Sequence, residues 1–335
     1  MIDSPPPVVH AQSLAKTFKD FWRRPNVNAV HDLSFTIQPG EIFGLLGPNG
    51  SGKSTTIKMI LGLLHPTRGR LTVLQRSPRD VRVKQRIGYL PEESYLYPYL
   101  TSEETLDFFG RLFDLAPSER RERTRQLLDM IGLSHARKRT VDEFSKGMAR
   151  RIGLAQALIN DPDLVILDEP TSGLDPLGCR QIKDLILTLA RRGKTVLMTS
   201  HLLSDVEDIC DRVAILYNGR LQALGTVDEL LEESTRYRLT LPPPFPPRHL
   251  PDLQSRIADL AGEPPHLDHP RRDLEQFFLD VIQKARSRTE AASGVAADKG
   301  LATYLSQPTP ETTPEIPPKN QTPDEALARL LKPKE

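Results

Sequence analysis

Two short segments of this chain carry residue types that can act on a phosphate anhydride. In the first, GPNGSGKST at 47–55, Gly47 is followed after four residues by Gly52, Lys53 and Ser54. Glycines at this spacing let backbone N–H groups turn inward around phosphate oxygens. Lys53 would reach the β- and γ-phosphates, and the Ser54 hydroxyl would take a Mg²⁺ position. The predicted nucleotide-binding residues are Gly47, Pro48, Asn49, Gly50, Ser51, Gly52, Lys53, Ser54 and Thr55.

The residues around this loop predict the elements that hold it. An apolar run at 42–46 precedes it, and apolar residues recur with helical spacing after it, at Ile57, Ile60, Leu61 and Leu64. This order is strand, loop, helix, so the N-terminus of the helix would add its positive dipole end to the phosphate site. A chance glycine-rich turn is the alternative, and it would not require the flanking strand and helix.

The second segment, LVILDEPTSGLDP at 164–176, places two acids directly after a continuous apolar run. Such a run is typical of a parallel strand that is buried on both faces. Asp168 would hold Mg²⁺, directly or through water, and Glu169 would orient and deprotonate an attacking water. An ordinary solvated turn is the alternative for an isolated Asp-Glu pair. Together with the phosphate loop, the pair predicts hydrolysis of a nucleoside triphosphate.

Composition narrows the class of protein. The 335 residues exceed one average domain, and a net charge of +1 gives no reason to expect nucleic acid as a partner. The two cysteines, Cys179 and Cys210, lie in or next to predicted helices, which disfavours a disulfide framework and favours a reducing compartment. The N-terminus lacks the features of a signal peptide, and no apolar run approaches the roughly 18 residues of a membrane span. We therefore expect a cytoplasmic protein.

Alternating strands and helices predict an α/β fold with a parallel sheet. Strands are expected at 8–18, 29–37, 42–46, 70–74, 87–90, 164–168, 195–200, 212–217 and 221–225. Helices are expected at 181–191 and 203–210. The charged, helical stretch at about 101–158 indicates a helical insertion in a nucleotide-binding domain that covers 8–234.

The chain changes character after this domain. We expect a small C-terminal domain at 235–288, because Leu274, Phe277, Phe278, Val281 and Ile282 follow the stripe of an amphipathic helix at 273–287. That helix would either pack on its own domain or contact a partner. Small residues, proline and threonine then dominate, which predicts a mostly disordered tail at 289–335 with a short possible helix at 323–332.

The order of motifs resembles that of the ATP-binding cassette (ABC) ATPases over about 8–234. The phosphate loop is followed by Ser145-Lys146-Gly147-Met148, by DEPTSGLD at 168–175 and by Thr199-Ser200-His201. The family's signature loop is usually Leu-Ser-Gly-Gly-Gln, so Lys146 and Met148 depart from it, as they do in similar variants of the exporter class. The resemblance implies a phosphate-loop hydrolase fold of the ABC type.

It also implies a head-to-tail dimer that holds two ATP molecules. Ser145, Lys146, Gly147 and Met148 would act in trans on the γ-phosphate, and Asp175 would communicate across the interface. His201 would contact the γ-phosphate and hold the attacking water near Glu169. The alternative for His201 is a histidine at a helix start without a ligand.

Three further positions follow from the resemblance. Adenine would stack on Phe18, with Phe21 and Trp22 as alternatives. Glu92 stands where the family has a glutamine that binds Mg²⁺, and a carboxylate is a harder ligand for this ion; a surface glutamate is the alternative. The aromatic stretch at 95–100 would receive a helix of the membrane subunit, or would pack on the helical insertion.

These inferences predict the ATP-hydrolysing subunit of an ABC exporter, with ATP and Mg²⁺ as ligands. Its partners would be a second copy of itself and an integral membrane permease, which would hold it at the inner face of the cell membrane. One alternative is a soluble cassette protein that acts on DNA or ribosomes. The second alternative is a protein that binds ATP without turnover. The presence of both Glu169 and His201 disfavours this alternative.

Overall fold

The structure is a computed structural model, and it describes residues 5–19, 25–93, 95–232, 247–262 and 265. At its centre is a six-stranded sheet of order β5-β6-β7-β3-β8-β9, in which all neighbours are parallel except β8 and β9. Its strands are β3 (Ile42–Leu46), β5 (Ile87–Leu90), β6 (Leu164–Asp168), β7 (Thr195–Ser200), β8 (Arg212–Tyr217) and β9 (Arg220–Thr226). Every residue of β3, β6 and β7 is buried, which accounts for their unbroken apolar character.

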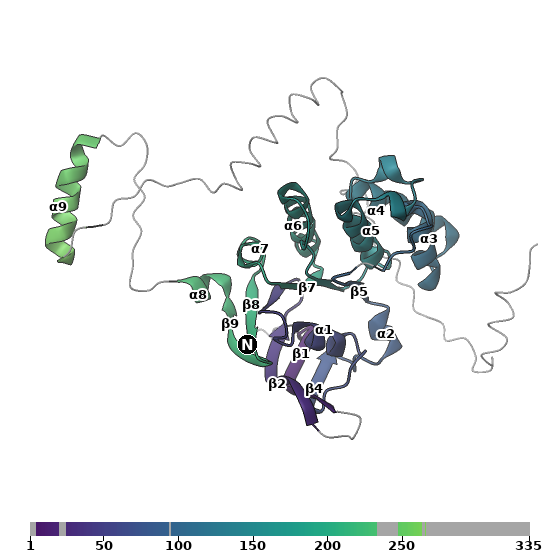
Figure 1. The fold of residues 1–335 in the computed structure, drawn as a ribbon, viewed down its shortest axis with the longest axis horizontal. Coiled ribbons are helices and arrows are strands. Elements are labelled where there is room, and N and C mark those ends of the chain that lie inside the picture. Colours follow the sequence, from purple (N-terminus) through teal and green to yellow (C-terminus); the bar gives the residue numbers. More distant parts are fainter. Residues whose placement is uncertain (1–4, 20–24, 94, 233–246, 263–264, 266–335) are drawn as a thin grey trace, which may run out of the picture.

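A second, antiparallel sheet covers one face of the first. It consists of β1 (Val9–Lys19), β2 (Pro25–Ile37) and β4 (Arg68–Val73), in the order β2-β1-β4. Helix α1 (Lys53–Ile60) lies between the two sheets in Figure 1. Phe35 and Phe43 stack across the two sheets with their centroids 5.4 Å apart. One apolar core therefore joins both sheets and α1.

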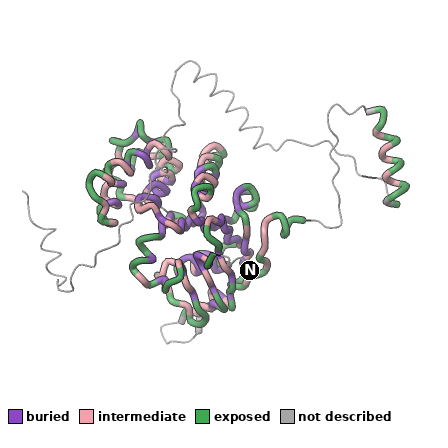
Figure 2. Tube along the Cα trace, turned by 180° about the vertical axis from the view of Figure 1, so that it is seen from behind, coloured by how far each residue is buried: buried purple, intermediate pink, exposed green. Residues whose placement is uncertain are grey.

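Helices cover the other face of the six-stranded sheet. The stretch between β5 and β6 contains α3 (Ser102–Leu112), α4 (Pro117–Met130), the 3₁₀ turns η1 (Ser134–Ala136) and η2 (Val141–Glu143), and α5 (Lys146–Leu158). Helices α6 (Pro176–Arg191) and α7 (Leu203–Glu207) complete this layer (Figure 1). Figure 2 shows the burial pattern that results, with buried strands inside and exposed outer faces on the helices.

The predicted α/β fold of the ABC type is confirmed, and each predicted strand within the described residues is present. Helix α6 begins five residues before the predicted position because Asp175 caps it and Pro176 takes its first turn. Helix α7 ends three residues before the predicted end. The short helices α2 (Val81–Lys84) and α8 (Val227–Leu231) were not predicted.

The C-terminal predictions fall mostly outside the described residues. This holds for the boundary at 234, the helix at 273–287 and the possible helix at 323–332. Within the described part, the 3₁₀ turn η3 (Pro247–His249) leads into an unpredicted helix, α9 (Leu250–Ala261). Among the described residues no helix is long and apolar enough to cross a bilayer, and no disulfide joins Cys179 to Cys210.

Candidate active site

The glycine-rich loop joins the central strand β3 to α1, and its glycines are required by close backbone packing. Gly47 has a φ of 150°, and a Cβ there would lie 2.2 Å from the carbonyl oxygen of Leu216. Gly52 has a φ of 103°, and a Cβ there would lie 2.6 Å from the carbonyl oxygen of Ala29. Side chains other than hydrogen are therefore excluded at both positions. The loop is held in one shape between β8 and β2.

Lys53 folds back over this loop and is buried. Its Nζ donates to the carbonyl oxygen of Gly47 at 2.6 Å and to that of Pro48 at 3.3 Å. The same Nζ lies 4.0 Å from Oε1 of Glu169. A cation held at the mouth of the loop, beside an acid, is placed for the charge on the terminal phosphates of a nucleotide.

One polar atom of the loop has no partner. The hydroxyl of Ser51 is buried, with the residue 2% exposed, and none of the described protein atoms accepts or donates a hydrogen bond to it. Buried polar groups are nearly always paired, so an orphan in this place fits a loop that awaits the oxygens of a ligand. The residues present therefore fit a bound nucleoside triphosphate.

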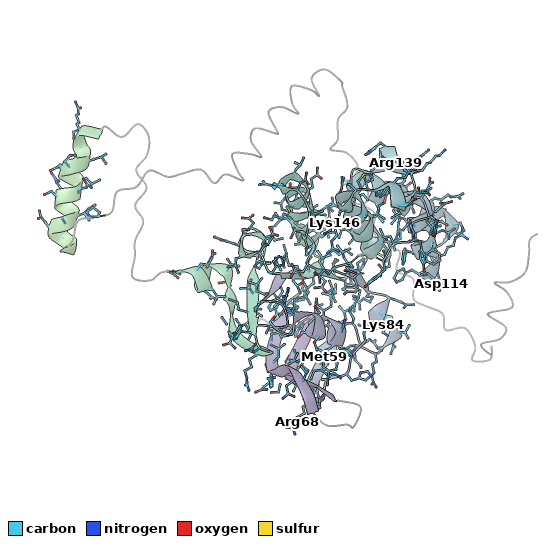
Figure 3. All side chains as sticks on the ribbon, in the orientation of Figure 1. Met59, Arg68, Lys84, Asp114, Arg139 and Lys146 are labelled. Atoms are coloured by element: carbon cyan, nitrogen blue, oxygen red, sulfur yellow. The ribbon has the colours of Figure 1, made fainter. Side chains whose placement is uncertain are left out.

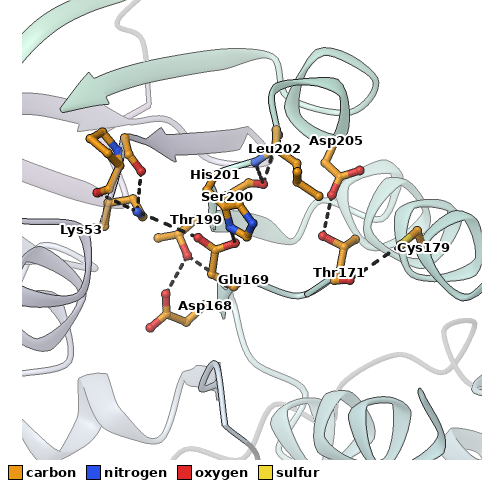
Figure 4. A network of polar contacts seen from close by, with 12 residues as sticks. Lys53, Asp168, Glu169, Thr171, Cys179, Thr199, Ser200, His201, Leu202 and Asp205 are labelled. Atoms are coloured by element: carbon orange, nitrogen blue, oxygen red, sulfur yellow. Dashed lines mark hydrogen bonds and ion pairs between the residues drawn. The ribbon is translucent and has the colours of Figure 1, made fainter. Parts of the chain in front are cut away.

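Asp168 is the last residue of β6 and Glu169 follows it, and both are held by the neighbouring strand β7 (Figure 4). The hydroxyl of Thr199 donates to Oδ1 of Asp168 at 2.6 Å and accepts from the backbone N–H of Glu169 at 2.9 Å. Glu169 has a φ of 51°, which is unusual for a residue with a side chain. Thr199 therefore fixes the backbone turn from Asp168, where the strand ends, to Glu169.

Glu169 also contacts His201, which follows β7. Nδ1 of His201 lies 2.7 Å from Oε2 of Glu169, while half of the imidazole remains exposed. The two oxygens of one carboxylate are therefore turned toward the cation of Lys53 and the ring of His201. Figure 4 shows these side chains converging from β6, β7 and the glycine-rich loop. Such a carboxylate, near a histidine and a lysine, can orient a water toward a phosphate.

A buried guanidinium ties the acids to the loop after β5. Arg150 of α5 donates to the carbonyl oxygens of five residues in two segments, namely Pro91, Glu92, Asp168, Glu169 and Pro170. Burial lowers the pKa of Arg150, and the surrounding acids oppose that shift. The guanidinium stays charged because its ordinary pKa is far above neutrality.

Neither this clamp nor the bridging role of Thr199 was predicted from the sequence. Thr199 belongs to the Thr199-Ser200-His201 motif, so the sequence did point to that position. Arg150 is a single arginine in a predicted helical stretch, and nothing in the sequence marks it as a functional residue.

The predicted signature loop lies at a different place, at the start of α5. The hydroxyl of Ser145 accepts from the N–H of Met148 at 3.2 Å, and Asp175 caps α6 in the same way through Gly178 at 2.9 Å. These two helix starts share a pocket of about 460 Å³, whose lining includes Ser145, Lys146, Gly147, Gly173, Asp175 and Gln181. Figure 3 places Lys146 between α5 and α6. No hydrogen bond or ion pair among the described residues joins this group to Lys53 or Glu169.

Lys146 lies against the loop that precedes α6. Gly173 has a φ of 71°, and a Cβ there would lie 2.2 Å from Nζ of Lys146. The absence of a side chain at Gly173 is therefore what admits the lysine.

Phe18 lies near the end of β1 and is 38% exposed. The ammonium of Lys16 lies over its ring, 5.3 Å from the centroid. It pairs with Val27, two positions before Ala29, whose carbonyl oxygen packs on Gly52. An exposed ring thus lies on the part of the second sheet that borders the phosphate loop. The alternatives Phe21 and Trp22 lie outside the described residues.

Glu92 is exposed, and its backbone is fixed by Arg150. Burial, then the carboxylate of Asp168, and more weakly that of Glu92, raise the pKa of Tyr89 to about 12. The carboxylates of Asp168 and Glu92 therefore both lie within electrostatic range of the Tyr89 phenol.

The oxygens of Asp168, Glu92 and Ser54 are donors of the kind that Mg²⁺ prefers. Among the described residues, no group of three or more His, Cys, Asp or Glu could by itself hold a metal ion.

The fold and this site define a phosphate-loop nucleoside triphosphate hydrolase, with a carboxylate and a histidine opposite the loop. Residues 30–172 match the family model described as ABC transporter. An uncharacterized ABC transporter ATP-binding protein of Nostoc is 47% identical over 309 residues, which cover 83% of this chain and 91% of that protein.

Two further comparisons agree. A fluoroquinolones export ATP-binding protein of Mycobacterium tuberculosis is 43% identical over 63% of this chain and 69% of its own length. A dimeric ATP-binding cassette in a post-hydrolysis state, bound to ADP and Pi, superposes with a TM-score of 0.60 at 26% identity, over 65% of this chain and 98% of that chain. This chain belongs to the ATP-binding proteins of ABC transporters. It is an ATP hydrolase that serves transport, as the motifs predicted.

Proposed function

We propose that this chain powers an exporter, and that ATP is hydrolysed at the site between the glycine-rich loop and the pair Glu169 and His201. The contact that carries the proposal is the 2.7 Å approach of His201 Nδ1 to Glu169 Oε2, with the ammonium of Lys53 4.0 Å from Oε1 of the same carboxylate. A base, its orienting partner and a phosphate-binding cation thus meet at one point. Relatives named for export support the direction of transport.

In this proposal Lys53 exchanges its bonds to the loop carbonyls for bonds to the β- and γ-phosphates. Glu169 accepts a proton from the attacking water, and His201 holds the carboxylate and that water in line with the γ-phosphate. The adenine ring stacks on Phe18. A Mg²⁺ ion held by Ser54 and Asp168, with Glu92 nearby, would neutralise charge on the phosphates.

The second half of the site would come from another copy of the chain. Ser145, Lys146 and Gly147 lie with Asp175 around a separate pocket, so these polar groups at two helix starts are open to an anion from outside. A head-to-tail dimer would bring them to the γ-phosphate on Lys53 of its partner. The dimeric cassette that this chain resembles supports such an assembly. The dimer would close when ATP binds and open after ATP is hydrolysed, and this motion would drive transport.

The membrane partner would dock beside the loop after β5. Tyr95, Tyr97 and Tyr99 are 80%, 52% and 86% exposed, and Tyr97 packs edge-on against Phe108 of α3. Large exposed aromatic side chains are typical of protein interfaces. Arg150 binds this loop and the catalytic strand end together, so docking and chemistry would share one clamp. The chain would then sit at the inner face of the membrane through an integral permease.

Two substitutions test the hydrolysis step. Glu169→Gln should keep ATP affinity, lower turnover at least about 100-fold, and trap an ATP-bound dimer, because binding persists while the base is lost. Lys53→Ala should instead weaken ATP binding about 10-fold to 100-fold, since charge-assisted bonds to phosphate are lost in the ground state as well.

The measurements are steady-state ATPase activity, calorimetric ATP affinity and the oligomeric state by light scattering. The exposed Glu207 and Lys58 provide matched controls as Glu207→Gln and Lys58→Ala. Wild-type turnover by Glu169→Gln would refute the assignment of the base. An ATP-bound monomer in this variant would refute the dimer.

A further inference from the structure

A buried polar network joins the segment after Glu169 to the segment after His201. The hydroxyl of Thr171 donates to Oδ2 of Asp205 at 2.5 Å, and Nζ of Lys183 lies 2.8 Å from Oδ1 of the same carboxylate. A second carboxylate, Asp208, also lies 2.8 Å from that Nζ. Thr171, Asp205 and Lys183 are buried, at 3%, 4% and 5% exposed, whereas the side chain of Asp208 lies at the surface.

This network is the last of three ties between the same two segments. Thr199 binds Asp168 and the backbone of Glu169, and His201 binds the carboxylate of Glu169. Thr171 then binds Asp205 on α7 (Figure 4). The pair of Glu169 and His201 therefore lies between two buried anchors, one on each side.

The network holds one preferred geometry because both oxygens of its buried carboxylate have partners. Both oxygens of Asp205 are occupied, one by the Thr171 hydroxyl and one by the Lys183 ammonium. Burial would lower the pKa of Lys183, but its bonds to Asp205 and Asp208 outweigh that effect and raise it. A buried charge left without its partner is costly, so any shift of α7 relative to Thr171 is opposed.

We propose that Thr171, Asp205 and Lys183 form a positioning network that sets the approach of His201 to Glu169 during ATP hydrolysis. None of the three touches the nucleotide in this proposal. Thr171 is two residues beyond Glu169, and Asp205 is four beyond His201, so a shift at the anchor moves both side chains of the pair. This inference rests on the proposed function of Glu169 and His201.

The test uses the purified full-length chain and Thr171→Val, which removes the hydroxyl and keeps a similar shape. We expect kcat to fall about 10-fold to 100-fold, as small misplacements of catalytic groups do, with KM for ATP within about twofold of wild type. Thr171→Ser should restore turnover because it restores the donor. The control is Thr188→Val on α6, whose exposed hydroxyl bonds only its own helix at the carbonyl oxygen of Asp184.

A double-mutant cycle separates positioning from general loss of structure. In a His201→Ala background, Thr171→Val should lower kcat less than about twofold further, because the pair that it positions is already broken. The proposal would be overturned if Thr171→Val lowered kcat by the same factor in the wild-type and His201→Ala backgrounds. So would a wild-type kcat for Thr171→Val.

A second readout does not depend on turnover. The ¹⁵N signals of the His201 imidazole in the nucleotide-free chain should shift in Thr171→Val and stay unchanged in Thr188→Val. Unchanged signals in both variants would overturn the proposal. Failure of the proposed function is distinguishable, because it would appear as wild-type turnover by Glu169→Gln, and the positioning role would then fall with it.

Discussion

Nδ1 of His201 and Oε2 of Glu169 lie 2.7 Å apart, although the two residues follow different strands of the sheet. Parallel neighbours β6 and β7 bring their carboxyl ends to one edge, so residues 32 positions apart in the chain share a hydrogen bond. Ligand sites of open α/β sheets lie at such edges. The contact leaves half of the imidazole exposed and able to meet a phosphate.

The first prediction concerns this histidine. His201→Ala should lower kcat for ATP about 100-fold, since the orientation of Glu169 and of the attacking water is lost. Affinity for ATP should change little, because Lys53 and the loop are untouched. Steady-state kinetics and calorimetry measure the two effects. His135→Ala, at an exposed histidine in η1, should behave as wild type, and full activity of His201→Ala would contradict the proposed role.

The second prediction concerns the clamp at Arg150. Arg150→Lys should lower the free energy of unfolding by about 3 kcal/mol, because an ammonium cannot reach all five carbonyl oxygens and buried acceptors lose their donors. ATPase activity should fall as well, since the loop after β5 is released from Asp168 and Glu169. Urea unfolding measures the stability change. Arg121→Lys at an exposed position of α4 should change neither quantity, and a urea unfolding curve of Arg150→Lys identical to that of wild type would rule out the clamp.

The third prediction concerns Glu92. If Glu92 serves Mg²⁺ as proposed, Glu92→Gln should be mild, because an amide oxygen would still reach the ion, whereas Glu92→Ala should lower the ATPase activity that the membrane subunit stimulates. ATP affinity should be kept in both variants. The measurement is ATP hydrolysis by wild type and both variants, with and without the membrane subunit. Equal stimulation of all three would identify Glu92 as a surface glutamate.

The fourth prediction concerns pH and the helical segment. Asp107 of α3 binds Arg120 of α4 and Arg111 of its own helix. Burial alone would raise the pKa of Asp107, but its hydrogen bonds to the two arginines outweigh burial and lower the pKa. The ionised carboxylate is thus favoured in the folded state. It contributes stability above the unfolded pKa of about 4 and loses that contribution as pH falls through the folded value.

Asp107→Asn should therefore lower the free energy of unfolding by about 1 kcal/mol at pH 7, a modest value because the pair is partly exposed. The difference from wild type should shrink as the solution is acidified below pH 4. Urea unfolding of wild type and Asp107→Asn, at pH 7 and at a pH below 4, measures this difference in the free energy of unfolding. Asp142→Asn, at an exposed aspartate of η2, should show no such difference. A loss that is the same at both pH values would contradict the electrostatic origin.

Local patterns were enough to predict much of the fold. The buried parallel strands have continuous apolar runs, so β3, β6 and β7 were predicted almost to the residue. Helix boundaries were less predictable. The start of α6 depends on a cap from Asp175, and no helix was predicted where α9 lies. Capping and packing decide such boundaries, and neither appears as periodicity.

The sequence by itself determined the chemistry of the site. The glycine loop, Lys53, the acid pair and His201 are short motifs whose backbone shape and functional groups are specified within a few residues. Tertiary structure alone decided which distant groups hold them in place. Arg150 reaches five carbonyl oxygens from another helix, Thr199 bridges two acids from the next strand, and Lys183 neutralises Asp205 across α6 and α7. Each of these contacts joins residues far apart in the chain, and only the packing of buried elements brings them within hydrogen-bonding distance.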